Sequence, residues 1–302
     1  MEFHPNRAVG LLAGGTIIAC LLTPAGLLVM RLLETPLSLT FLAYCLVALA
    51  LAGLAGIFVF WCYGCWSLSY VVDRNQLTLN WGSIKQIIPM QAIQKLCPGT
   101  EINGRLHIRG INWPGHHVGK GSVEGLGETL VYCTHVSPKD VTYVMTPTVA
   151  YAISPMDPRA FAAELRIRQH LGPIQTVRQH ARRWPWTRWA VWHDPWVWLL
   201  VALALMVNVL LFAYVLYFYP SLPELIRLHF TPLGEVDRVG MKGEVLTLPG
   251  FAAAVWALNA VLGLILHARE RAATYILLGG AVFVQLVLWV ATLSIVGRSV
   301  SG

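Results

Sequence analysis

The chain has 302 residues, of which 56% are hydrophobic and only 12% are charged. Charged residues make up about a quarter of an average soluble domain, so this composition excludes a water-exposed surface over the whole chain. The formal net charge of +7 comes from basic residues that gather in the middle of the sequence, while both ends carry few charges. We therefore expect much of the chain to face lipid.

Five stretches are long and apolar enough to cross a bilayer as helices, which takes about 20 residues each. They are residues 8–30, 39–62, 196–219, 251–266 and 272–296. We interpret the first as a span and not as a cleaved lipoprotein signal, because the chain stays apolar for ten residues beyond Cys20. The six cysteines are interpreted as small buried residues, since the Cys62-x-x-Cys65 pair has no second pair to complete a redox or metal site.

After the second span, the sequence changes to short strand-like runs separated by turn residues. These runs are residues 70–72, 77–81, 84–88, 106–111, 129–134, 141–146 and 149–153. Asp157 and Pro158 then predict a helix start, since Asp caps free backbone N–H groups and Pro is tolerated in the first turn. Phe161 and Leu165 lie one turn apart and give this helix an apolar face. The pattern predicts a small domain of strands closed by one helix.

Residues 113–120 contain two adjacent histidines and two glycines and are expected to form a loop. A metal site built from His107, His116 and His117 is the alternative interpretation. Adjacent histidines do not reach one ion without an unusual backbone turn, and no Cys or carboxylate stands at ligand spacing beside them. We therefore expect no metal and no cofactor.

Four stretches of this region carry a resemblance to a known family: residues 70–79, Ile88-Pro89 with Ile93, residues 113–119 and residues 153–161. They are similar to the bacterial pleckstrin-homology (PH)-like domains found in membrane proteins, over about a third of the chain. The resemblance implies a seven-stranded, strongly bent sheet capped by a helix. It also implies a binding or scaffolding role without catalytic residues.

Cationic and indole side chains alternate just before the third span. Such a mixture binds nucleic acid in some soluble proteins, but its place beside a span favours a membrane interface. Each Lys or Arg near an anionic leaflet adds about 1 kcal/mol of attraction. We expect an anchor for anionic headgroups and no nucleic-acid partner, with ordinary flanking of a span by basic residues as the alternative. The residues expected at this lipid interface are Arg178, Arg182, Arg183, Trp184, Trp186 and Arg188.

The positions of Lys and Arg predict the orientation, since cationic loops are retained in the cytoplasm. Residues 67–194 hold fourteen Lys and Arg against eight Asp and Glu, and the link between the last two spans carries Arg269 and Arg271. The loop 220–245 instead holds three basic and four acidic residues. We expect a multi-pass plasma (inner) membrane protein, with its N-terminus and central domain in the cytoplasm and with this loop and the C-terminus outside.

The outer loop follows the third span directly, and its residues 222–242 read LPELIRLHFTPLGEVDRVGMK. Its apolar residues Leu225, Ile226 and Leu228 are expected to dip into the membrane interface. The loop is also expected to form a small polar site for a cation or a peptide. The residues expected to bind a ligand or partner there are Pro223, His229, Phe230, Gly234, Asp237 and Lys242, with Glu235 close to them.

This stretch resembles the L-P-x-x-I-P-x-H-F-x-x-x-G-x-x-D-x-x-G-x-K signature of a domain of unknown function that is shared with SdpI-like immunity proteins. The resemblance implies a membrane role in sensing, or in protection against a toxin or envelope stress, with the outer loop as the receiving surface. Arg227-Leu228 and Thr231 depart from the signature, so the resemblance does not identify a specific immunity partner.

Together, these patterns predict a membrane α-helical protein of about five transmembrane helices, with an inserted cytoplasmic β-rich PH-like domain capped by one helix. The expected divisions are a two-helix hairpin at 1–66, the PH-like domain at 67–171, a basic and aromatic juxtamembrane linker at 172–195, and a three-helix region at 196–302 with its outer loop at 220–248.

We expect a non-enzymatic sensor or scaffold, or an immunity-like envelope protein, that couples the outer loop to the cytoplasmic domain and binds an unknown protein or peptide. A transporter component for a small solute or peptide is the alternative. The five spans contain no Asp, Glu, Lys or Arg, and interhelical hydrogen bonding is the simpler role for Asn208, Asn259 and Gln285. The chain has no G-x-S-x-G, H-E-x-x-H or P-loop motif. His193-Asp194 is interpreted as a belt residue followed by a helix cap.

Overall fold

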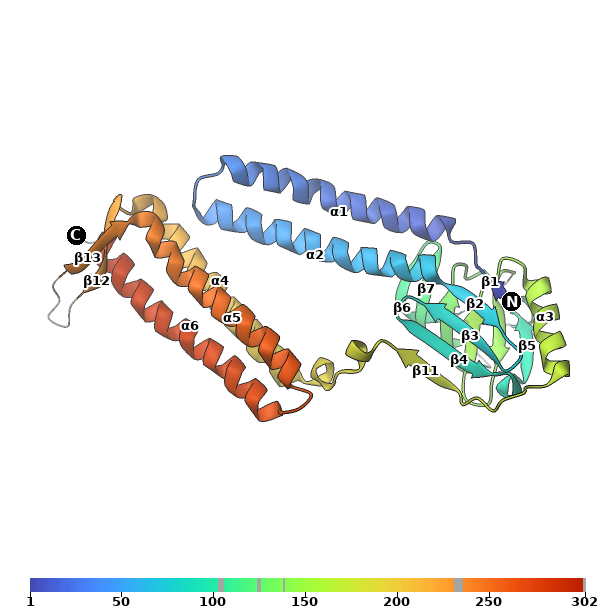
Figure 1. The fold of residues 1–302 in the computed structure, drawn as a ribbon. Helices are drawn as coiled ribbons and strands as arrows, with labels where there is room; N and C mark the ends of the chain where they lie inside the picture. Colours follow the sequence, from blue (N-terminus) through green and yellow to red (C-terminus); the bar gives the residue numbers. More distant parts are fainter. Residues whose placement is uncertain (103–105, 124–125, 138, 231–235, 301–302) are drawn as a thin grey trace. The chain divides into compact units, whose positions relative to one another are not determined.

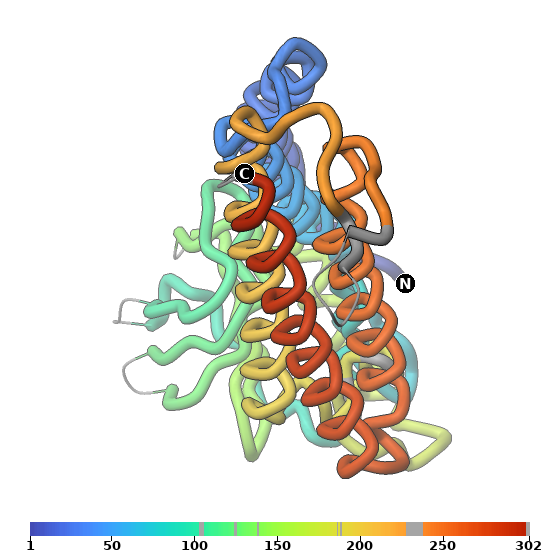
Figure 2. Tube along the Cα trace, turned by 90° about the vertical axis from the view of Figure 1, so that its left-hand side faces the viewer, coloured from blue at the N-terminus to red at the C-terminus, as the bar shows by residue number. Residues whose placement is uncertain are grey.

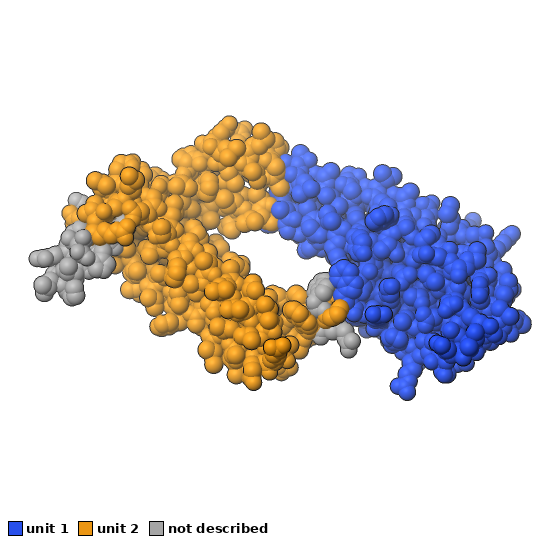
Figure 3. All heavy atoms as spheres, viewed as in Figure 1, with its two compact units in different colours: residues 1–24, 50–184 blue, residues 25–49, 185–302 orange. Residues whose placement is uncertain are grey.

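The computed structural model describes residues 1–102, 106–123, 126–137, 139–230 and 236–300, and of residues 186, 188, 228–230, 236, 237 and 300 it describes the backbone alone. The chain divides into two compact units (Figure 3). The first unit comprises Met1–Pro24 and Ala50–Trp184, and the second comprises Ala25–Leu49 and Pro185–Gly302.

Within the described residues, five helices are long and apolar enough to cross a membrane (Figure 1). They are α1 (Ala8–Glu34), α2 (Leu39–Ser67), α4 (Pro195–Phe218), α5 (Thr247–Leu266) and α6 (Arg271–Val300). Each coincides, to within a few residues at either end, with one of the five predicted apolar stretches. The helices mark the chain as a multi-pass membrane protein, as predicted.

The first unit contains a β domain with two sheets (Figure 1). One sheet has the order β1-β2-β3-β4-β11, and all of its neighbouring strands are antiparallel. Its strands are β1 (Glu2–Phe3), β2 (Ser69–Val72), β3 (Gln76–Trp81), β4 (Ile84–Pro89) and β11 (His180–Arg183). The first and last of these lie far apart in the sequence from the three central strands.

The second sheet has the order β5-β9-β10-β8-β7-β6 and is antiparallel except where β10 runs parallel to β8. Its strands are β5 (Lys95–Pro98), β6 (His107–Trp113), β7 (His116–Val123), β8 (Gly127–Cys133), β9 (Thr142–Met145) and β10 (Ala150–Ile153). The β-rich domain is therefore present as predicted, but its strands form two sheets and not the single seven-stranded sheet that the resemblance implied.

The expected loop at 113–120 was wrong, because this stretch is most of a β-hairpin. Only Pro114 and Gly115 form the turn between β6 and β7, and Gly119 of β7 lies opposite Gly110 of β6. A Cβ on Gly119 would overlap the carbonyl oxygen of Arg109, so the two strands approach too closely for a side chain. Glycine is depleted in ordinary strands, and this composition hid the strand from sequence analysis.

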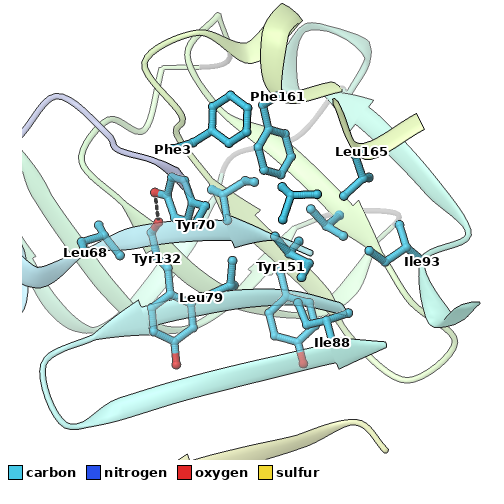
Figure 4. Packing of buried hydrophobic residues seen from close by; sticks show 14 of the residues in the cluster. Phe3, Leu68, Tyr70, Leu79, Ile88, Ile93, Tyr132, Tyr151, Phe161 and Leu165 are labelled. Carbon is cyan, nitrogen blue, oxygen red and sulfur yellow. Dashed lines mark hydrogen bonds between the residues drawn. The ribbon is translucent and has the colours of Figure 1, made fainter. Parts of the chain in front are cut away.

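Helix α3 (Pro158–Leu171) closes the core of the β domain (Figure 4). It begins as predicted, because the Asp157 carboxylate accepts hydrogen bonds from the backbone N–H groups of Arg159 and Ala160. Phe161 and Leu165 are fully buried, and the Phe161 ring packs edge-on against Phe3 with centroids 5.4 Å apart. The apolar face of the predicted helix is thus the lid of this core.

The second unit contains a bundle of α4, α5 and α6, which lie side by side (Figure 2). A hairpin of β12 (Leu225–Phe230) and β13 (Val236–Met241) connects α4 to α5 at one end of the bundle. The hairpin is attached by an apolar cluster that comprises Val215, Leu222, Ile226, Val245 and Val296. Three helices thereby give the hairpin the hydrophobic support that an isolated two-stranded sheet lacks.

Candidate functional site

The β domain joins the membrane hairpin without a flexible linker. Helix α2 ends at Ser67 and strand β2 begins at Ser69, so the span leads directly into the first sheet. At the same junction, the β6–β7 turn packs against the start of α1, where a Cβ on Gly115 would overlap the backbone of Gly10. The indole N–H of Trp113 donates to the carbonyl of Gly10 at 3.3 Å. These contacts attach the β domain to the ends of α1 and α2.

Aromatic rings fill the space around this junction. The Trp81 indole lies against Gly64 of α2, where a Cβ would be 2.6 Å from the ring. The same indole donates its N–H to Nε2 of His116 at 3.3 Å, and the Trp113 ring packs on the imidazole with centroids 4.9 Å apart. Indole rings at the point where a span leaves the bilayer are typical of the headgroup level.

His116 and His117 have structural surroundings. His116 is fully buried, and this burial, with the neighbouring His117 as a smaller cause, lowers the pKa of its imidazole to about 4. His116 is therefore neutral near pH 7. His117 places Nδ1 2.6 Å from the side-chain oxygen of Asn112. Among the described residues, no three His, Cys, Asp or Glu side chains gather where they would share a metal ion.

The basic segment before α4 contributes a strand to the β domain. Residues His180–Arg183 form β11, which pairs with β4 so that Arg182 lies opposite Lys85 and Arg183 opposite Ile84. Arg178, Arg182 and Arg183 are exposed, and the Trp184 side chain is 45% exposed. The side chains of the other two expected lipid-interface residues, Trp186 and Arg188, lie outside the described ones.

Sequence analysis did not find this strand, because HARR lacks the alternation of apolar residues that identifies strands. It forms where the edge of β4 offers free backbone groups. Strand β11 places Arg182 and Arg183 at the sheet edge, and Arg182 lies directly opposite Lys85 of β4. Like charges in that position destabilise a strand pair.

A polar network crosses the interior of the α4–α6 bundle. The Asn208 side-chain amide donates to Pro249 O at 3.1 Å and to Gln285 Oε1 at 3.2 Å. Gln285 in turn donates to Ala252 O at 3.0 Å, so one network joins three helices. The predicted interhelical role is confirmed for Asn208 and Gln285. It was wrong for Asn259, whose amide donates to Val255 O within its own helix.

We expect Asn208→Leu to destabilise the bundle, because it leaves the buried Gln285 oxygen and the Pro249 carbonyl without this donor. Interhelical hydrogen bonds in membranes contribute about 0.6 kcal/mol on average and up to about 1.7. Reversible unfolding of the purified protein in mixed detergent micelles measures the loss. Asn259→Leu is the matched control and is expected to cost less, and equal losses for the two variants would contradict the interhelical role.

Asp194 is a helix cap, as predicted, but its partner is not His193. Its carboxylate accepts from the backbone N–H of Trp196 at 3.1 Å and from the Tyr275 hydroxyl at 2.7 Å. The buried His267 places Nε2 3.5 Å from the same carboxylate. Three helix ends meet at this carboxylate. Its partners His267 and Tyr275 were not evident from the sequence, because they lie 73 and 81 residues further along the chain.

The Tyr275 hydrogen bond, with the backbone N–H groups of Val197 and Trp196 as smaller causes, holds the pKa of Asp194 below its usual range. The stabilisation by this carboxylate is therefore complete at neutral pH. It is lost as the pH falls below about 3.9, the ordinary Asp value, and through the lower pKa of the folded state. We expect Asp194→Asn to lower the melting temperature at pH 7 and to flatten its acid dependence.

The melting temperature of the wild type and of the two variants Asp194→Asn and Asp73→Asn, measured from pH 7 to pH 3, checks this expectation. Asp73 is an exposed residue of the β domain, so its variant is expected to keep the acid dependence of the wild type. The role assigned to Asp194 is wrong if its variant loses stability on acidification as steeply as the wild type does.

The β12–β13 hairpin carries the residues expected to bind a partner in the outer loop. Lys242 forms an ion pair with Glu224 at 2.7 Å, beside Pro223, and Arg238 forms one with Glu244 at 2.8 Å. The backbone places His229 and Phe230 on β12 and Asp237 on β13, while their side chains lie outside the described ones. Gly234 and Glu235 lie outside the described residues altogether.

The expectation that Ile226 dips into the membrane interface was wrong, because its side chain is 1% exposed and packs on the helices of the bundle. Leu225 points the other way and is 65% exposed. On the partner strand, Met241 lies opposite Leu225 and Val239 opposite Arg227, and both are more than half exposed. The outer face of the hairpin thus combines three apolar side chains, those of Leu225, Val239 and Met241, with the exposed Arg227. At its base, the opposite charges within the two ion pairs neutralise each other.

A multi-pass helical bundle that carries a two-sheet β domain with a C-terminal helix defines a class, namely membrane proteins with an inserted PH-like domain. Family comparisons agree with this class. Residues 68–169 match the family model of the bacterial PH domain, and residues 206–253 match Domain of unknown function (DUF1648), the domain found in SdpI-like proteins. No curated protein and no solved structure matches the chain significantly.

The two matches fall on the two structural regions described above. The first covers β2 to β10 and nearly all of α3, while β1 and β11 lie outside it. The second extends from the middle of α4, through the β12–β13 hairpin, into α5. Both resemblances predicted from the sequence are therefore confirmed, and the strands that enlarge the first sheet are additions to the matched domain.

Proposed function

We propose that the protein is a non-enzymatic membrane sensor or scaffold of the cell envelope. The β12–β13 hairpin receives a protein or peptide on the outer side, and the PH-like domain presents a binding surface on the cytoplasmic side. The orientation rests on the excess of Lys and Arg in residues 67–194 and at the Arg269–Arg271 link. Envelope stress or a toxic peptide is the kind of signal that the likeness to SdpI-like proteins suggests.

The observation that carries this proposal is the direct attachment of the PH-like domain to the α1–α2 hairpin. The Gly10–Gly115 contact and the run of α2 into β2 leave no flexible linker, so a displacement of these helices moves the domain with them. A tethered domain that only bound a soluble ligand would not need this attachment. The arrangement favours a protein that transmits changes in the membrane region to the cytoplasmic surface.

The hairpin has the features of a receiving surface. Its exposed face combines Leu225, Val239 and Met241, and exposed apolar groups of this kind are typical of sites that a partner covers. The helix bundle beneath it supports binding better than transport. Asn208 donates its amide N–H groups to Gln285 Oε1 and to the Pro249 carbonyl, and Gln285 donates to the Ala252 carbonyl, so the two side chains leave little free polarity for a solute path.

Substituted-cysteine labelling in intact cells tests the proposal. The background variant lacks the six native cysteines, and single cysteines replace the exposed residues Val239 on the hairpin and Gln175 after α3. A membrane-impermeant maleimide is expected to label position 239 in intact cells and position 175 only after permeabilisation. Labelling of position 175 alone in intact cells would invert the topology and overturn the proposal.

A further inference from the structure

A cleft of about 610 Å³ lies between the two sheets of the β domain. Strands β3, β4 and β11 form one wall, and β6, β7 and β8 form the other. Apolar side chains from both walls line its interior, namely Ile84, Ile111, Val118, Leu130 and Val149. The Tyr132 hydroxyl, which accepts a hydrogen bond from Gln86 at 2.9 Å, also lies in the lining. The interior therefore suits an apolar group better than an ion.

Cations surround this apolar interior. Arg109 of β6 and Lys120 of β7 lie directly opposite each other, and Arg183 stands on the other wall. Among the described residues that line the cleft, Glu128 is the one carboxylate, and it pairs with Lys120 at 3.3 Å. Three cations against one carboxylate leave a net charge of +2. Like charges in directly opposed strand positions destabilise the pair, and Glu128 offsets only one of the two.

The cleft lies beside the junction of the β domain with the membrane helices. Trp81 lines the cleft and also contacts Gly64 in the last turns of α2. The turn at Gly82 and Ser83, which connects the two strands of this wall, approaches the same helix, and the Trp184 backbone N–H donates to Ser83 O at 3.3 Å. Because α2 is long and apolar enough to span a bilayer and Gly64 lies in its last turns, we expect this end of the cleft at the depth of the lipid headgroups.

We propose that this cleft is a binding site for a phosphate-bearing anion with an apolar attachment, in which Arg109, Lys120 and Arg183 hold the phosphate and the apolar lining receives the attached group. Arg is suited to this task because its planar guanidinium pairs with two phosphate oxygens. The site extends the proposed function, because it gives the cytoplasmic domain a ligand. Its placement on the membrane side rests on that proposed function. Strand β11, which supplies Arg183, lies outside the segment that matches the PH family.

The full-length protein in detergent micelles, titrated with dihexanoyl phosphatidylglycerol, inorganic phosphate and dihexanoyl phosphatidylcholine, tests the site. Binding is measured by native mass spectrometry. Binding of the phosphatidylglycerol but not of phosphate or phosphatidylcholine assigns the site to an anionic lipid. Binding of inorganic phosphate with equal affinity assigns it to a free phosphate compound. Equal binding of phosphatidylcholine, or no binding of either anion, overturns the proposal.

Two double variants locate the site. Arg109→Gln with Arg183→Gln removes two cations inside the cleft and is expected to weaken anion binding about 30-fold, at about 1 kcal/mol per cation. Lys85→Gln with Arg182→Gln removes the same charge from the β4–β11 pair, at positions that do not line the cleft, and is expected to change binding less than threefold. Arg183→Lys keeps the charge but loses the two-point contact with phosphate, so it is expected to weaken binding less than the cleft double variant does, which separates loss of the ligand contact from misfolding.

The experiments can reject the binding site in the cleft and the proposed function separately. Equal weakening by both double variants means that the whole basic edge attracts anions without a defined site, which overturns the cleft and leaves the membrane-facing role of the domain intact. A topology with the β domain outside, found by the cysteine labelling, overturns the proposed function, while the selectivity of the cleft for an anion is measured independently of it.

Discussion

Replacing Gly115 by alanine is expected to lower the free energy of unfolding of the β domain by about 2–5 kcal/mol. Gly115 has a φ of +79°, and a side chain in that conformation costs about 1–2 kcal/mol. The added Cβ would also overlap the backbone of Gly10, and overpacking of this kind costs about 1–3 kcal/mol more. The atoms that the Cβ would overlap all belong to the backbone of Val9 and Gly10, and not to a flexible side chain. The turn and helix α1 must therefore move apart.

Gly172→Ala is the matched control, because Gly172 has a similar φ of +67° but no atom within 4 Å of the added Cβ. Its ψ of 151° places Gly172 in a backbone region that is essentially restricted to glycine, so this variant is expected to show a conformational cost of about 1–3 kcal/mol alone. The free energy of unfolding of both variants is measured by urea unfolding in detergent, with thiol labelling of the buried Cys97 and Cys133 as the signal. If the two substitutions cost the same, the contact between Gly10 and Gly115 does not hold the domain on the helices.

Replacing Phe161 by alanine is expected to destabilise the β domain by about 3–5 kcal/mol, the usual cost of deleting a buried Phe ring. The ring is fully buried and packs against Phe3 from the N-terminal strand and Tyr70 from β2, at centroid distances of 5.4 and 6.5 Å. The substitution therefore leaves a cavity where α3, β1 and β2 meet, and the surrounding backbone does not collapse fully into it.

Ile167→Ala on the same helix is the control for Phe161→Ala. Its side chain is 54% exposed, so we expect a change within about 0.5 kcal/mol. The same thiol-labelling measurement applies, since Cys133 lies in the buried interior of the domain. A loss below about 1 kcal/mol for Phe161→Ala would show that α3 is not the lid of the core and that the first sheet closes by other contacts.

Binding at the cleft and attachment at the junction have a common consequence for function. The Gly10–Gly115 contact orients the β domain on its spans, and the β3–β4 wall of the cleft reaches the same helix α2 through Trp81. A ligand that closes the two sheets on itself would therefore act on α2 directly. Such an action would give the proposed sensor a physical route between a ligand of the β domain and the membrane helices.

Much of the architecture was predictable from local patterns. A run of about 20 apolar residues has one stable form in lipid, because only a helix satisfies its own backbone groups there. The start of α3 was likewise readable, since Asp157 and Pro158 act on the backbone beside them, and the spacing of Phe161 and Leu165 predicts which face is buried. The PH-like and DUF1648 segments were recognisable because short motifs carried each resemblance.

The sequence by itself determined the five apolar helices, the β-rich domain between them and the helix that covers its core, because these depend on residues close together in the chain. Only the tertiary structure decided that β11 joins β4, that β7 is a strand despite its glycines, and that Asp194 meets His267 and Tyr275. Side-chain periodicity reports the burial of a local segment. Backbone pairing and long-range hydrogen bonds depend on which distant segments the fold brings together, and no local pattern records that choice.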